Sequence, residues 1–172
     1  MANPMTVHVE VWPVAADEAG LWLLDKCSPW MGGAVMSDDD PHAEVEYVLD
    51  QHDALANVLL IHSTSWRVDR RGVLLTYMAV IGVDNDYVTE RWPDARPVGA
   101  ALMVAVGKPI PHGPTEAPWP DAAHVMFHGL RHLRFLMDYD TANAAALNEH
   151  WRAHLAPLTP ELARMYLGGE VA

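Results

Sequence analysis

The sequence contains a single cysteine, Cys27, and little positive charge. One cysteine excludes an internal disulfide bond, and a chain of 172 residues is long enough to bury a core without one. Its 11 basic residues stand against 23 acidic ones, which gives a formal net charge of −12. A surface this negative repels phosphate backbones, so we expect no general nucleic-acid binding.

Long apolar runs are also missing. No run approaches the about 20 apolar residues that a membrane-spanning helix needs. The first residues lack the basic and then apolar layout of a signal peptide. We therefore expect no membrane partner and a cytoplasmic location. The hydrophobic residues make up 51% of the chain and the charged residues 20%, which is typical of a globular protein.

Strand patterns fill the first two thirds of the chain. Valines alternate at the start, and further β-branched or apolar stretches follow, bounded by glycine, proline and charged residues. The stretch 84–97 is charged and carries two prolines, so we expect a loop there. The expected strands are 5–14, 21–24, 34–36, 58–66, 73–83 and 98–106.

One helix is predicted between the early and the later strands, from about residue 39 to residue 52. Asp39 or Asp40 can cap its first free amide groups, and Pro41 suits the first helical position. Its apolar stripe is expected to consist of Val45, Val48 and Leu49.

The remainder of the chain is predicted to be helical. Residues 107–120 are rich in proline and indicate an extended crossing. Helices are expected over about 121–137, from Asp140 onward, and from Thr159, where threonine, proline and glutamate form a start signal. The expected fold class is α/β, as a single domain over 1–172 with a β-rich core at 5–106 and a helical extension at 121–168.

The order strand, strand, glycine turn, helix, strand, strand resembles a Nudix domain over about 5–106. That family has a loop–helix box that starts with glycine and carries glutamates at fixed spacings. Anchored on Gly33, the box places Asp39 at the first glutamate, Leu49 at an aliphatic position, and Ala54 and Leu55 at its end. The resemblance implies a Nudix-like mixed-sheet sandwich with a helical C-terminal extension.

Most carboxylates of the Nudix box are absent from this chain. Nudix enzymes cleave a diphosphate linked to another group, using divalent metals held by the helix glutamates. At those helix positions the chain has Val48, Gln51 and His52. The resemblance therefore implies a domain without ordinary hydrolysis that binds a small nucleotide-like or phosphorylated ligand or a protein partner. Whether it is an enzyme, and whether a divalent metal binds, stay open.

The candidate ligand-binding residues lie in or after this box. Arg67, with Trp66 beside it, is expected at the wall of the pocket, while Asp39 and His52 are the ligands that the box retains. Glu46 and Asp50 are one helical turn apart and can hold a displaced metal. The alternative interpretation of these two acids is a solvated helix face.

Histidine is frequent, with ten residues in the chain. His124, His128 and His132 recur at every fourth position of one predicted helix, and His150 and His154 repeat this spacing on the next. A helical wheel places the three histidines beside the apolar stripe of their helix, outside its centre.

Three interpretations of these histidines stay open. His124, His128 and His132 can be metal ligands. Two of them can form an anion pocket with Arg131 or Arg134, or all three can lie at the rim of a helix packing. The alternative function is therefore an enzyme that uses this cluster as metal ligands or as general acid and base. The wide apolar arc of the helices also allows a homodimer.

Overall fold

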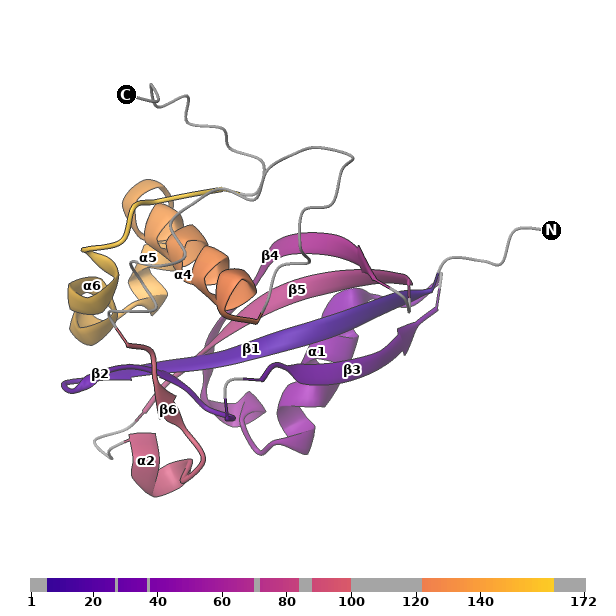
Figure 1. The fold of residues 1–172 in the computed structure, drawn as a ribbon, viewed down its shortest axis with the longest axis horizontal. Coiled ribbons are helices and arrows are strands. Elements are labelled where there is room, and N and C mark those ends of the chain that lie inside the picture. Colours follow the sequence, from indigo (N-terminus) through magenta and orange to yellow (C-terminus); the bar gives the residue numbers. More distant parts are fainter. Residues whose placement is uncertain are drawn as a thin grey trace.

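The computed structural model of the chain describes residues 6–26, 28–36, 38–69, 72–83, 88–99 and 122–162. These residues form a mixed α/β fold in which a six-stranded sheet has helices on both faces (Figure 1). None of the helices in these ranges is long and apolar enough to cross a membrane.

The sheet is organised around β1 (Val7–Asp17). On one side β1 pairs in parallel with β5 (Gly72–Ile81), which pairs antiparallel with β4 (Val58–Asp69). On the other side, the first half of β1 pairs with β3 (Trp30–Val35) and the second half with β2 (Gly20–Leu23), both antiparallel. The strand order is β4-β5-β1-β2-β6, with β6 (Arg96–Pro97) at the edge and β3 beside β1.

Successive side chains of β1 point into two different cores. Trp12 and Val14 pack in the core on the side of the sheet that α4 (Ala122–Tyr139) covers, the α4 side, whereas Val9 and Val11 pack in the core on the side of α1 (Pro41–Gln51), the α1 side. Because helices cover both faces, the strand is buried continuously from residue 9 to residue 16.

α1 (Pro41–Gln51) forms where the sequence predicts a helix. The side chain of Asp40 caps it by accepting a hydrogen bond from the backbone N–H of His42 at 2.9 Å. Glu44 accepts a hydrogen bond from the backbone N–H of Gly33 at 2.6 Å, which ties the helix to β3. The predicted apolar stripe is confirmed, since the buried residues of α1 are Val45, Val48 and Leu49.

The other face of the sheet is covered by α4 (Ala122–Tyr139), α5 (Thr141–Ala146) and α6 (Glu149–Leu155) (Figure 1). The helix expected from Asp140 is therefore two helices, because Asn148 caps a new one with its side chain. α4 approaches β5 closely at Gly129, where a Cβ atom would overlap the side chain of Met78.

Four sequence expectations differ from the structure or fall outside it. The predicted loop 84–97 contains α2 (Val88–Arg91) and β6 (Arg96–Pro97), which pairs with β2. Residues 159–162 are not helical, and Thr159 and Glu161 are hydrogen-bonded to Arg131 of α4, while the rest of the helix expected from Thr159 lies outside the described residues. Most of the predicted strand 98–106 and the proline-rich crossing 107–120 lie outside the described residues.

Candidate functional site

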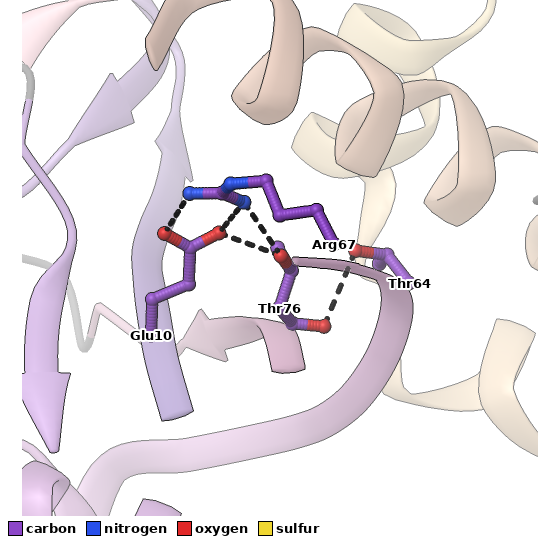
Figure 2. Close-up of polar contacts among 4 residues, drawn as sticks. All are labelled: Glu10, Thr64, Arg67 and Thr76. Carbon is purple, nitrogen blue, oxygen red and sulfur yellow. Dashed lines mark hydrogen bonds and ion pairs between the residues drawn. The ribbon is translucent and has the colours of Figure 1, made fainter. Parts of the chain in front are cut away.

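Glu10 is a charged residue inside the core on the α4 side, with a side chain only 1% exposed. Arg67 of β4 forms a two-pronged ion pair with it, and Arg67 Nη2 donates to Glu10 Oε2 at 2.6 Å. Thr76 of the intervening strand β5 donates its hydroxyl to Glu10 Oε1 at 2.6 Å (Figure 2). A carboxylate can be buried here because both of its oxygens are paired.

Glu10 and Thr76 engage only part of the Arg67 guanidinium. A guanidinium has five N–H donors. Glu10 takes two of them and Thr76 Oγ1 takes a third at 3.2 Å, all on the two Nη atoms. Neither residue uses the Nε–H or the second Nη2 hydrogen, and the Arg67 side chain is 25% exposed. Two N–H groups on one guanidinium edge match the spacing of two phosphate or carboxylate oxygens.

Three histidines meet where α4 packs against β4. His62 Nε2 lies 3.4 Å from His132 Nε2, and the two rings are perpendicular with centroids 4.7 Å apart. His128, one turn earlier on α4, has its ring centroid 6.2 Å from that of His132. His62 is not among the candidates from the sequence, because its partner lies 70 residues away along the chain.

The packing keeps His132 neutral. Desolvation, followed by the proximity of His62 and His128, lowers the pKa of His132 to about 4, although the Thr64 backbone offsets part of this shift. Desolvation also lowers the pKa of His62 from its usual 6.5, against the opposing influence of the Asp140 carboxylate. Both rings are therefore mainly neutral at pH 7, and a neutral imidazole can both donate and accept a hydrogen bond.

The other charged groups near these histidines are paired. His128 Nδ1 lies 4.0 Å from Glu161 Oε1, and Glu161 also pairs with Arg131. Arg134 pairs with Asp138 one turn along α4. Within the described part of the chain, no three His, Cys, Asp or Glu side chains are grouped as a metal ion would require, and His124 forms no such group with His128 and His132.

The candidate residues of the Nudix-like box lie near α1. Asp39 precedes the helix and accepts a hydrogen bond from the backbone N–H of Met36 at 3.3 Å. His52 follows the last turn of the helix. Glu46 and Asp50 are exposed between them, and Glu46 lies 3.8 Å from His42.

The sheet separates Trp66 from Arg67. Trp66 is opposite Leu75, which packs against the α1-side core, whereas Arg67 contacts Glu10 and Thr76 on the α4 side. The six candidate ligand residues therefore do not converge on one pocket. The structure instead places Arg67 on the same face of the sheet as His62 and His132.

Comparisons of the chain with protein-family models, with curated proteins and with solved structures found no match.

Proposed function

We propose that the protein binds a small phosphorylated or nucleotide-like ligand through Arg67, and that it does so as a Nudix-like domain without ordinary Nudix hydrolysis. The observation that carries this proposal is the geometry of Arg67. Buried Glu10 and Thr76 hold one edge of the guanidinium, and neither uses the two N–H groups of the other edge.

Glu10 acts in this proposal as a support for Arg67. An arginine that is already ordered loses little further side-chain entropy when it binds. The ion pair is neutral overall, so attraction for an anion comes from the two directed N–H groups. The net charge of −12 repels large polyanions, and three quarters of the Arg67 side chain is buried. Both features favour a small ligand over a nucleic acid or a protein surface.

The absence of hydrolysis is inferred from the residues at the box positions on α1. Val48 is buried in the core and Gln51 is exposed, and neither provides the carboxylate that holds magnesium in Nudix enzymes. Asp39 and His52 lie at opposite ends of the helix, so they cannot replace that ligand set together.

The direct test is ¹⁵N NMR of the Arg67 Nε–H group during titration with inorganic phosphate, a ribose phosphate and nucleoside mono- and diphosphates. A binding ligand is expected to shift this resonance. Arg67→Lys keeps the charge and loses the planar fork, so it is expected to weaken binding at least about 10-fold. Arg152→Lys is the matched control, because the Arg152 side chain donates to the backbone carbonyls of Ala144 and Leu147 and contacts no carboxylate among the described residues.

Two results would overturn this proposal. The first is a full ligand panel that leaves the Arg67 Nε–H resonance unmoved while the protein is folded. The second concerns the non-hydrolytic part alone, and it is strong magnesium-dependent cleavage of a nucleoside diphosphate derivative by the purified protein.

The contact between His62 and His132 favours a second candidate function, general acid–base catalysis on the same sheet face. Two mainly neutral imidazoles 3.4 Å apart can pass a proton between a bound substrate and solvent. If so, His62→Gln and His132→Gln should each lower turnover of a phosphorylated substrate by about 100-fold or more and change the pH profile, with binding unchanged. Unchanged turnover in both variants would exclude this role.

A further inference from the structure

A cavity of about 220 Å³ lies on the opposite side of the sheet from Arg67. Four separate segments form it: the end of β2, the start of β3, the end of α1, and the end of α2 with the loop that follows it. Two of its residues, Leu24 and Trp30, belong to the α1-side core. The cavity is lined by Leu24, Asp25, Trp30, His52, Arg91, Trp92, Pro93 and Asp94.

Two stacked pairs of flat side chains line this cavity. The rings of Trp30 and His52 are parallel within 1°, with centroids 4.0 Å apart. The guanidinium of Arg91 lies over the ring of Trp92, 4.6 Å from its centroid. A flat, partly apolar lining favours a planar ring, and the volume is below the about 300–1,000 Å³ of pockets for drug-sized ligands. One small ring system therefore fits the cavity better than a whole nucleotide.

The charges of the lining select the kind of ring. Arg91 is already engaged, because it stacks on Trp92 and donates to the backbone carbonyl of Asp53 at 3.2 Å. Asp94 is paired with Lys26 at 3.3 Å, but both side chains are more than half exposed, so this ion pair is weak. Asp25 Oδ2 accepts the indole N–H of Trp30 at 3.2 Å.

The lining thus holds two carboxylates against one guanidinium, which keeps its charge while its face and one N–H group are engaged. The net charge of −12 adds an attraction for cations over the whole surface. A positively charged or amino-substituted ring would donate charge-assisted hydrogen bonds to Asp25 or Asp94 while it stacks on the aromatic side chains.

We infer that this cavity is a binding site for a small planar ring compound that carries a cationic or amino group. The site is separate from the anion site proposed at Arg67, and neither depends on the other. The two sites lie on opposite faces of one sheet and select ligands of opposite charge.

The experiment compares three probes of nearly equal shape: benzamidine, benzamide and benzoate. Binding is followed by ¹⁵N NMR of the Trp30 and Trp92 indole N–H groups, with the indole N–H of Trp151 in α6 as the internal control. Benzamidine is expected to shift the first two resonances and to bind at least 10-fold more tightly than benzoate. Benzamide should lie between them.

Two variants test the walls of the cavity. Trp92→Ala should abolish benzamidine binding, and Asp94→Asn, at a side chain that is 59% exposed, should weaken it several-fold. Arg67→Lys should leave it unchanged, which separates this inference from the proposed function. Benzoate binding as tightly as benzamidine would overturn the charge assignment. No shift of either indole by any probe in folded protein would overturn the site itself.

Discussion

Glu10 and Arg67 form a buried ion pair across an intervening strand, since Glu10 is on β1, Arg67 is on β4, and β5 lies between them. Neighbouring strands are about 4.8 Å apart, so the arginine and glutamate side chains together bridge about 10 Å of sheet. Thr76 of β5 fills the middle and bonds to both charged groups. The three side chains connect the three strands on one face.

We predict that removing one partner of this pair is strongly destabilising. Glu10→Ala and Arg67→Ala should each lower the free energy of unfolding by about 3–5 kcal/mol, because the remaining buried charge loses its partner. The double variant Glu10→Leu/Arg67→Leu should lose much less free energy of unfolding than the two alanine variants lose together. Urea unfolding measures each value.

The control for this prediction is the ion pair of Arg134 and Asp138, which lie one turn apart on α4. Breaking that more exposed pair with Asp138→Ala should cost about 0–1 kcal/mol. Equal losses from Glu10→Ala and Asp138→Ala would show that burial adds nothing to the Glu10 pair.

Local features of the sequence were sufficient to predict much of the fold. The alternating valines of β1 and the Asp40–Pro41 start of α1 act within a few residues, so each element is recognisable without its neighbours. The parallel pairing of β1 with β5 cannot be recognised in this way, because it depends on contacts between segments 66 residues apart, as from Glu10 to Thr76. The division into α5 and α6 depends on Asn148, a cap residue whose signal is present in the sequence.

Only part of the candidate site was predictable, because its partner residues also lie far apart along the chain. Arg67 and His132 stood out by residue type, but their partners did not, since Glu10 is 57 residues from Arg67 and His62 is 70 residues from His132. One signal for Glu10 was available. It is a single acid between valines in a strand that is apolar on both faces, and such an acid needs a buried partner.

The backbone of Gly72 yields a second prediction. Its φ of +134° is in the region that residues with a Cβ atom rarely adopt, and a Cβ here would overlap the backbone carbonyl of Thr6. Gly72→Ala should therefore lower the free energy of unfolding by at least about 1–3 kcal/mol. Gly20→Ala is the control, because no atom lies within 4 Å of a Cβ at that position. Thermal unfolding measures both variants, and an equal loss of stability in the two would contradict this argument.

Asp17 gives a third prediction, on the β1–β2 turn. Burial alone would raise its pKa, but hydrogen bonds from the Trp22 indole and from the backbone N–H groups of Val88, Ala19 and Gly20 outweigh burial and lower the pKa below 3.8. Asp17→Ala should lower the free energy of unfolding by about 1–2 kcal/mol at pH 7, because these hydrogen bonds are lost.

The lowered pKa of Asp17 also fixes how this loss depends on pH. A carboxylate with a depressed folded-state pKa contributes stability above its unfolded value of 3.8, and the contribution disappears as the pH falls through the folded-state pKa. The difference between wild type and Asp17→Ala should therefore shrink below pH 3.8. A difference that stays constant down to pH 2 would show that packing, not the ionised carboxylate, is responsible.

His132 gives the last prediction, on stability in mild acid. Its folded-state pKa of about 4 lies below its usual 6.5, so the unfolded chain binds more protons between these two values. Stability from this group is complete above pH 6.5 and is lost progressively as the pH falls to about 4. A pKa shift of this size corresponds to about 3 kcal/mol of stability. His132→Gln, which cannot be protonated, should remove this part of the pH dependence.

His150→Gln on α6 serves as the control. If His132→Gln retains the full slope between pH 6.5 and pH 4, another group is responsible for it, and NMR titration of the individual histidines would identify that group.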